Sequence, residues 1–221
     1  MQGIGLLSRL KEVWRYSCFK RMDIERIELA RIPDMAPVYG GVRGRTMSSK
    51  HLAYAWKALV EAGVRTLIDL REKDYSDRLP QLCKEYGLDY FHYPVVSGRE
   101  AVARMMELFP RLCELIDRGD FYIACAMGLH RTDIALCAYW VFYGADKGLE
   151  PPALHGYLRE KGMRTDKMAS MLNAIYCYLT ELNGVEPMPA NVFKERKAMI
   201  FEAAGNSLSL STLKNSRSPS E

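Results

Sequence analysis

Along the middle of the chain, segments with the apolar pattern of strands alternate with segments with the apolar pattern of helices. Short apolar runs bounded by Gly, Pro or charged residues predict buried strands, and apolar positions every three to four residues predict helices. Strands are expected at residues 64–70, 88–95 and 121–125, with a short extended segment at 38–41. Helices are expected at residues 48–62, 78–86, 101–118, 131–143, 152–162 and 167–183. This alternation predicts an α/β fold with a single, mostly parallel central sheet flanked by helices.

The two ends of the chain differ from its centre. Residues 4–20 have apolar side chains at helical spacing, which we interpret as an amphipathic helix packing on the domain. An anchor at a membrane surface is the alternative interpretation of this helix. We therefore divide the chain into an N-terminal helical extension (1–33), a central domain (34–183), a C-terminal helix (184–204) and a Ser-rich tail (205–221) that we expect to be disordered.

The composition is that of an ordinary globular protein. The 221 residues are 48% hydrophobic and 26% charged, which excludes a disordered, collagen-like or coiled-coil chain. A formal net charge of +4 is too weak to indicate a nucleic-acid partner. No apolar run reaches the roughly 18 residues that cross a bilayer, and the N-terminus becomes charged too early for a signal peptide. We expect a cytoplasmic protein, and the sequence leaves its oligomeric state open.

One of the six cysteines stands apart from the others. The chain has no C-x-x-C pair and no His at zinc-finger distance, so we expect no structural metal and no cofactor. Cys125 ends the predicted strand 121–125, and the sequence CAMGLHRT then leads directly into a helix. The other five are expected to pack in the core like small apolar side chains: Cys18, Cys83, Cys113, Cys137 and Cys177.

The loop after Cys125 has the features of an anion-binding cradle. A loop that runs into a helix N-terminus directs several backbone N–H groups to one place, and the helix dipole there favours negative charge. Gly128 gives the loop backbone freedom, and Arg131 can bind two oxygens as a planar fork. The hydroxyl of Thr132 can donate to the sulfur. We expect the thiolate form of Cys125 to be stabilised at this position.

These residues resemble the C-x5-R signature loop of the cysteine-dependent protein tyrosine and dual-specificity phosphatases. The preceding segments PVYGGVRGRTM, EAGVRTLIDLRE and GLDYFHYPV are similar to the compact dual-specificity-like branch, so the resemblance covers about residues 36–183. It implies that Cys125 is a nucleophile forming a phosphocysteine, that Arg131 clamps the phosphoryl group, and that Thr132 assists departure of the thiolate. It also implies that no metal is needed.

The resemblance further implies which residues hold the phosphoryl oxygens. These are the loop positions Ala126, Met127, Gly128, Leu129, His130 and Arg131. Two neighbours depart from the family pattern, since the family usually has His at the position of Ala124 and Gly at that of Asp133. A protonated His130 could partly offset the negative charge of Asp133; a plain loop residue is the alternative interpretation of His130.

The segment that carries the general acid in the family also departs from the pattern in this chain. The family normally carries an Asp about 30 residues before the cysteine, which protonates the leaving oxygen. Here the corresponding stretch, PVVSGRE, has Glu100 as its only carboxylate, 25 residues before Cys125. Glu100 is our candidate acid, and a first-turn helical residue without catalytic role is the alternative. Asp74 and Asp77, in the charged loop REKDYSD, are further candidates.

The function predicted from the sequence is hydrolysis of phosphate monoesters on a phosphorylated protein or a small molecule. Protein phosphotyrosine is the favoured substrate, with dual specificity included, because neutral side chains at Ala126, Met127 and Leu129 do not suit a highly charged inositol headgroup. The alternative is a pseudophosphatase that binds phosphorylated partners without useful turnover. Three arginines are candidates for the rim of the site, with ordinary surface charge as the alternative: Arg43, Arg45 and Arg71.

Overall fold

The computed structural model describes residues 35–46, 52–72, 78–95, 99–154, 165–183 and 187–215. Its contacts divide the chain into two units, Met1–Thr132 and Asp133–Glu221, and the boundary lies inside one helix, α6 (His130–Tyr139). The N-terminal helix expected at residues 4–20 lies outside the described residues. No helix among the described residues is long and apolar enough to cross a membrane.

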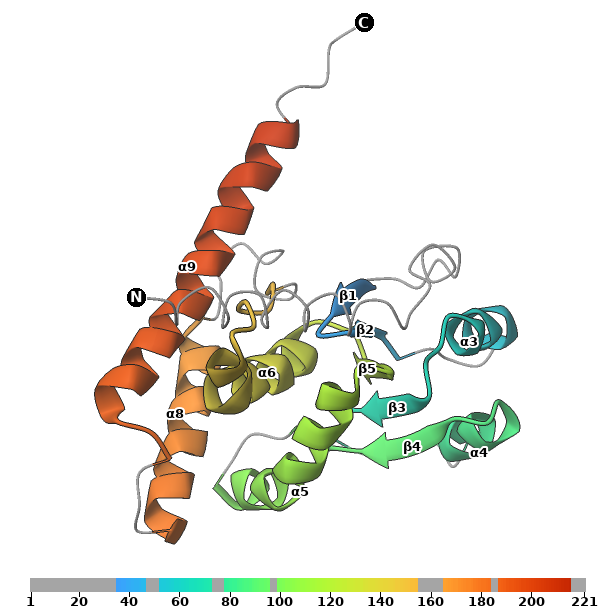
Figure 1. Ribbon diagram of the computed structural model, residues 1–221, viewed down its shortest axis with the longest axis horizontal. Helices are drawn as coiled ribbons and strands as arrows, with labels where there is room; N and C mark the ends of the chain where they lie inside the picture. The colour runs from blue at the N-terminus through green and yellow to red at the C-terminus, as the bar shows by residue number, and fades with distance from the viewer. Residues whose placement is uncertain are drawn as a thin grey trace, which may run out of the picture. The chain divides into compact units, whose positions relative to one another are not determined.

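The first unit is built on one mixed sheet with the strand order β1-β2-β5-β3-β4 (Figure 1). Its strands are β1 (Ala36–Val38), β2 (Gly41–Arg45), β3 (Thr66–Asp69), β4 (Asp89–His92) and β5 (Phe121–Cys125). The β1–β2 pair is antiparallel, and the other three pairs are parallel. The predicted α/β class with a mostly parallel sheet is therefore confirmed. Because β5 lies in the middle, the last residue of that strand reaches the centre of the sheet's carboxyl edge.

The extended segment expected at residues 38–41 is instead the turn of a hairpin. Tyr39 and Gly40 join β1 to β2 with φ angles of 50° and 76°, as in the two-residue turns that match strand twist. The register pairs Val38 with Gly41 directly across the turn. The sequence lacks the Asn-Gly or Asp-Gly signal that marks such a turn, so one segment was expected where two strands exist.

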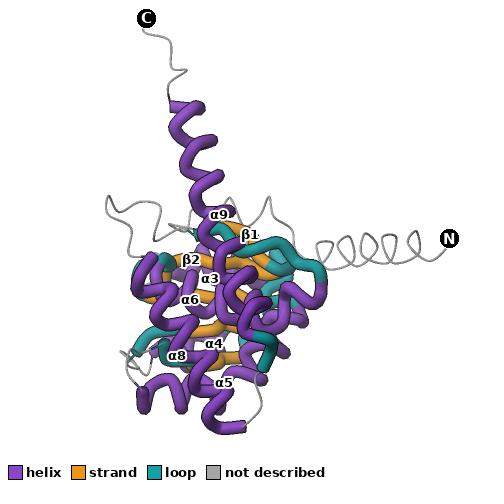
Figure 2. The backbone as a smooth tube through the Cα atoms, turned by 90° about the vertical axis from the view of Figure 1, so that its left-hand side faces the viewer, coloured by secondary structure: helices purple, strands orange, loops and turns teal. Residues whose placement is uncertain are grey.

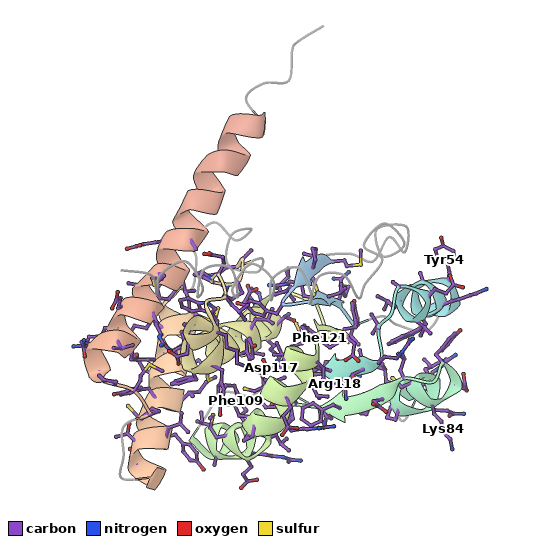
Figure 3. All side chains as sticks on the ribbon, in the orientation of Figure 1. Tyr54, Lys84, Phe109, Asp117, Arg118 and Phe121 are labelled. Carbon is purple, nitrogen blue, oxygen red and sulfur yellow. The ribbon has the colours of Figure 1, made fainter. Side chains whose placement is uncertain are left out.

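Helices cover both faces of the sheet. On one face, α3 (Leu52–Glu61) and α4 (Arg78–Glu85) pack their apolar side chains against β2, β3 and β5, in a core that includes Trp56, Leu67 and Tyr122. Thr66 points to the opposite face, because successive strand residues alternate. There its hydroxyl accepts a hydrogen bond from Arg118, the last residue of α5 (Arg99–Arg118). Figure 3 labels Arg118 on α5 near the start of β5.

The described residues of the second unit form helices joined by turns and loops (Figure 2). The end of α6 continues as a π-helical turn (Trp140–Gly144) and a 3₁₀ turn (Ala145–Lys147). Two longer helices follow, α8 (Thr165–Asn183) and α9 (Ala190–Asn215). Stacked rings join α8 to α9, where the centroids of Tyr176 and Phe193 lie 4.3 Å apart. This unit therefore has an aromatic core of its own.

Two helix ends in this part of the chain differ from the sequence-based expectation. The α9 helix continues to Asn215 rather than ending at residue 204, so residues 205–215 of the expected tail are helical. The one strong helix breaker in that stretch is Gly205, which costs only about 1 kcal/mol relative to Ala. Residues 152–154 are not helical, and the rest of the helix expected at 152–162 lies outside the described residues.

A buried ion pair closes the carboxyl end of β3. Asp69 is 1% exposed and accepts three hydrogen bonds from the Arg71 side chain, from Nε to Oδ1 at 2.9 Å and to Oδ2 at 3.1 Å, and from Nη2 to Oδ2 at 2.6 Å. The Tyr90 hydroxyl of β4 donates to the same carboxylate at 3.0 Å. Removing one partner of such a pair leaves an uncompensated buried charge.

We therefore expect Asp69→Ala to lower the free energy of unfolding by about 3–5 kcal/mol, because Arg71 would lose its buried partner. The control is Glu114→Ala, which removes the exposed Arg111–Glu114 pair on α5 and should cost less than about 1 kcal/mol. Urea titrations of both variants measure the difference. Equal costs for the two would contradict the account of Asp69.

Candidate active site

The backbone of Cys125 is fixed by the strands on either side of β5. Its carbonyl oxygen accepts hydrogen bonds from the Thr46 N–H at 2.8 Å and from the Gly128 N–H at 3.1 Å. On the other side, the Leu70 N–H donates to the carbonyl of Ala124 at 2.8 Å. The Cys125 residue is 4% exposed. The candidate nucleophile thus lies in a rigid position at the carboxyl edge of the sheet, where open α/β sheets bind ligands.

The loop after Cys125 lies directly on β2. Gly128 has a φ of +68°, and a Cβ at this position would lie 2.6 Å from the Arg45 nitrogen and would also strike the backbone of Gly44. A residue other than glycine therefore fits neither the backbone conformation nor the space. The Gly128 N–H bond to the Cys125 carbonyl closes the loop into a tight turn.

Several hydrogen-bond donors at the loop have no acceptor. In the part of the chain that the structure describes, the backbone N–H groups of Ala126, Met127 and Leu129 are without one. The α6 helix begins at His130, and the first N–H groups of a helix have no acceptor within it. The buried hydroxyl oxygen of Thr132, in the first turn of α6, also has no hydrogen-bond partner. An anion at this place would meet several donors.

The guanidinium of Arg131 is held by a carboxylate. Its Nη2 lies 3.3 Å from Oε2 of Glu72, and the two side chains are 32% and 46% exposed. Glu72 directly follows Arg71, whose carbonyl oxygen accepts a hydrogen bond from Nε2 of His92 at 2.8 Å. The sequence did not single out Glu72, because it is one of several charges in the loop REKDYSD and only the folded chain shows its partner.

Two of the three arginines considered for the rim are buried, which fits neither a rim position nor ordinary surface charge. Arg43 is 1% exposed and lies beneath the loop, where its Nη2 donates to the carbonyl of Gly128 at 3.0 Å. Arg71 is 8% exposed and is paired with Asp69. Arg45 is partly exposed, and its Nη2 lies 2.7 Å from the sulfur of Met127. The strand order buries position 43 and leaves position 45 at the edge of the sheet.

The side chains proposed as the general acid lie outside the described part of the chain. Glu100 is the second residue of α5, which begins two positions before the predicted start at 101, and its side chain is outside the described part. Asp74 and Asp77 are outside the described residues as well. The general acid therefore stays a prediction from the sequence.

The cysteines other than Cys125 differ in burial, and Cys18 lies outside the described residues. Cys83, Cys113 and Cys137 are buried as expected, whereas Cys177 on α8 is exposed, contrary to the expectation of core packing. Burial raises the pKa of the Cys83 thiol to about 12, and the Asp69 carboxylate adds to this effect. Cys83 is therefore a poor nucleophile near neutral pH. No group of three or more His, Cys, Asp or Glu side chains in the described residues could hold a metal ion.

Two glycines of the same conformation separate backbone strain from contact with β2. Gly87 has a φ of +69° with nothing within 4 Å of a built Cβ, whereas Gly128 has a φ of +68° and faces the β2 backbone. Gly87→Ala should cost about 1–2 kcal/mol of unfolding free energy, from backbone strain alone. Gly128→Ala should cost about 1–3 kcal/mol more, because the loop must leave β2. Urea denaturation of the two variants gives the comparison, and equal costs would show that the loop does not lie on β2.

Comparisons with known proteins bear on this fold. No family model and no curated protein matches the sequence. Among solved structures, a DUF442 protein from Shewanella putrefaciens CN-32, a candidate phosphatase by its name, matches with a TM-score of 0.51 and 16% identity, over 71% of this chain and 98% of its own. P. aeruginosa TpbA matches with a TM-score of 0.40 and 12% identity, over 81% of this chain and 90% of its own.

The core catalytic domain of the PP-IP phosphatase SIW14 from S. cerevisiae matches with a TM-score of 0.40 and 12% identity, over 85% of this chain and 96% of its own. At such identities the likeness concerns the fold, and the DUF442 protein is the match of the three that carries it. The likeness agrees with the fold inferred from the sequence: the chain has the same α/β fold as the DUF442 protein.

Proposed function

We propose that this protein is a cysteine-dependent phosphatase that hydrolyses phosphate monoesters through a phosphocysteine at Cys125. One observation supports this most. The central strand ends at Cys125, and the loop that follows carries backbone N–H groups with no acceptor among the described residues. The same loop leads within seven residues to Arg131 and the buried hydroxyl of Thr132. Nucleophile, anion donors and cation therefore come from one short segment on a rigid sheet.

In the first step, the Cys125 thiolate attacks phosphorus and the ester P–O bond breaks. The leaving oxygen takes a proton from the general acid, for which Glu100 is the proposed residue and Asp74 or Asp77 the alternatives. The loop N–H groups and Arg131 bind the three phosphoryl oxygens. Donors fixed in advance stabilise the developing charge without reorganisation, which is the largest contribution to catalysis of this kind.

In the second step, the carboxylate left by the general acid takes a proton from water as the water oxygen attacks phosphorus, and the S–P bond breaks. This releases orthophosphate and the Cys125 thiolate and restores the protonated acid. The Thr132 hydroxyl donates a hydrogen bond to the sulfur as negative charge returns to it. Two displacements with modest barriers replace one difficult hydrolysis. This two-step reaction needs no metal, because Arg131 and the loop N–H groups stabilise the charge on the phosphoryl group.

Substrate binding requires Arg131 to exchange Glu72 for the phosphoryl group. Both side chains are partly exposed, and an ion pair of this kind is worth about 0–1 kcal/mol. A carboxylate and a phosphate can each bind a guanidinium through two parallel hydrogen bonds, and the greater charge of a phosphate makes it the stronger ligand. Glu72 therefore weakens substrate binding only slightly, and it keeps Arg131 at the site when no substrate is present.

Phosphotyrosine on a protein is the substrate we propose, with dual specificity included. The side chain of Met127 is 46% exposed on the loop, and the Arg45 guanidinium lies beside it. A flexible thioether next to a cation suits the ring of an aryl phosphate. Cys125 is 4% exposed, so a long side chain that presents its phosphate far from the peptide backbone reaches it best.

We expect Cys125→Ser to lower kcat/KM for 4-nitrophenyl phosphate by at least about 10³-fold, because the nucleophile is lost. Cys177→Ser is the matched control, since Cys177 is an exposed thiol on α8, and it should retain wild-type activity. EDTA should change neither protein's rate. A wild-type chain that binds a phosphotyrosine peptide but releases no phosphate would identify the pseudophosphatase instead.

A second prediction concerns the general acid. A general acid must be protonated to act, so kcat should fall as the pH rises through its ionisation. Glu100→Gln should remove this alkaline limb and lower kcat by about 10²–10⁴-fold for phosphotyrosine, with a smaller loss for 4-nitrophenyl phosphate, whose leaving group needs less protonation. An unchanged alkaline limb would eliminate Glu100, and the same profile would then be measured for Asp74→Asn and Asp77→Asn.

A further inference from the structure

A buried arginine supports the loop from below. Arg43 lies on β2 and is 1% exposed, a degree of burial that is rare for a charged side chain. In the register of β2 and β5, Arg43 faces Ile123 and Arg45 faces Cys125. Since strand residues two apart share a face, the Arg43 side chain leaves the sheet on the same face as that of Cys125. Its Nη2 donates a hydrogen bond to the Gly128 carbonyl at 3.0 Å.

This hydrogen bond sets the direction of a backbone N–H group. The Gly128 carbonyl and the Leu129 N–H belong to one planar peptide, and in a trans peptide the two point in opposite directions. When Arg43 holds the carbonyl toward β2, the Leu129 N–H points to the side of the loop that β2 does not cover. That N–H is one of the loop donors with no acceptor among the described residues.

Close packing alone does not fix this direction. The contact of Gly128 with Gly44 holds the loop against β2, but glycine tolerates many backbone conformations, so the peptide after it can turn over at little cost. A loop that needs glycine for its close approach therefore needs a separate donor to select one orientation of the next peptide. Arg43 is placed to be that donor.

We propose that Arg43 is a positioning residue that aims the Leu129 N–H at the bound phosphoryl group. This inference rests on the proposed phosphatase function and deepens it. Arg43 touches neither the substrate nor the sulfur in this account, and it acts through the Gly128–Leu129 peptide. A merely structural arginine would stabilise the fold and leave anion binding unchanged once the protein is folded.

The test uses the full chain with Arg43→Met, Arg43→Lys and a matched control. The control is Arg65→Met, because the Arg65 guanidinium also donates to a backbone carbonyl, that of Val60 at 3.2 Å, but it is exposed and precedes β3 at the opposite edge of the sheet. Calorimetric titration with sodium tungstate measures oxyanion binding. The kcat and KM values for 4-nitrophenyl phosphate measure turnover, and thermal melting verifies that each variant is folded.

We expect Arg43→Met to weaken tungstate binding and kcat/KM together by about 10- to 100-fold, less than the loss on deleting a transition-state donor outright. Arg43→Lys has a shorter reach and loses the planar fork, so its tungstate affinity should fall more than about twofold below wild type and stay above that of Arg43→Met. Arg65→Met should stay within about twofold of wild type. The parallel loss in tungstate affinity and kcat/KM is the signature that a structural role does not produce.

The outcomes separate this inference from the phosphatase proposal. A folded Arg43→Met variant with wild-type tungstate affinity overturns the inference and leaves the proposed function standing. If Arg43→Met does not fold, Arg43→Lys decides, and a tungstate affinity within twofold of wild type overturns the inference. A wild type without Cys125-dependent turnover whose tungstate binding is lost in Arg43→Met supports the inference and ends the phosphatase proposal. A wild type that binds no tungstate overturns both.

Discussion

The close approach of the Cys125 loop to β2 is the constraint on which the rest of the candidate site depends. Glycine stands on both sides of the contact, at Gly44 on the strand and at Gly128 in the loop, and a side chain at Gly128 would displace the loop. Because the loop is in contact with the β2 backbone, the Cys125 carbonyl can accept hydrogen bonds from the N–H groups of both Thr46 and Gly128. The chain then enters α6 immediately, which brings the helix N-terminus to the carboxyl edge of the sheet.

Two guanidinium groups serve this loop in different ways, and their burial explains the difference. Arg43 is 1% exposed, so its bond to Gly128 is shielded from water and fixed in geometry. Arg131 is 32% exposed, and its ion pair with Glu72 is of the weak surface kind that a phosphate can displace. In the function we propose, the buried group shapes the anion-binding loop, and the exposed group exchanges Glu72 for the phosphoryl group. Such a binding site needs rigidly held hydrogen-bond donors, and it also needs a charged group whose partner, here Glu72, the substrate can replace.

The sequence was sufficient for what depends on local pattern and insufficient for what depends on strand order. Apolar periodicity predicts most strands and helices, and the spacing from Cys125 to Arg131 predicts the loop. Each of these signals extends over only a few neighbouring residues. The burial of Arg43 and Arg71 could not be predicted from the local pattern, since the burial of a charged side chain depends on which strands become neighbours. The partner of Glu72 is likewise 59 positions away along the chain.

A crystal structure of the full chain with tungstate tests the central claim most directly. The account predicts the oxyanion above Cys125, with hydrogen bonds from the loop N–H groups, that of Leu129 included, and with Arg131 moved from Glu72 to the anion. The Gly128 carbonyl should still accept its bond from Arg43 beneath the loop. A tungstate bound elsewhere, or a Gly128–Leu129 peptide turned so that its carbonyl faces the anion, would contradict the account.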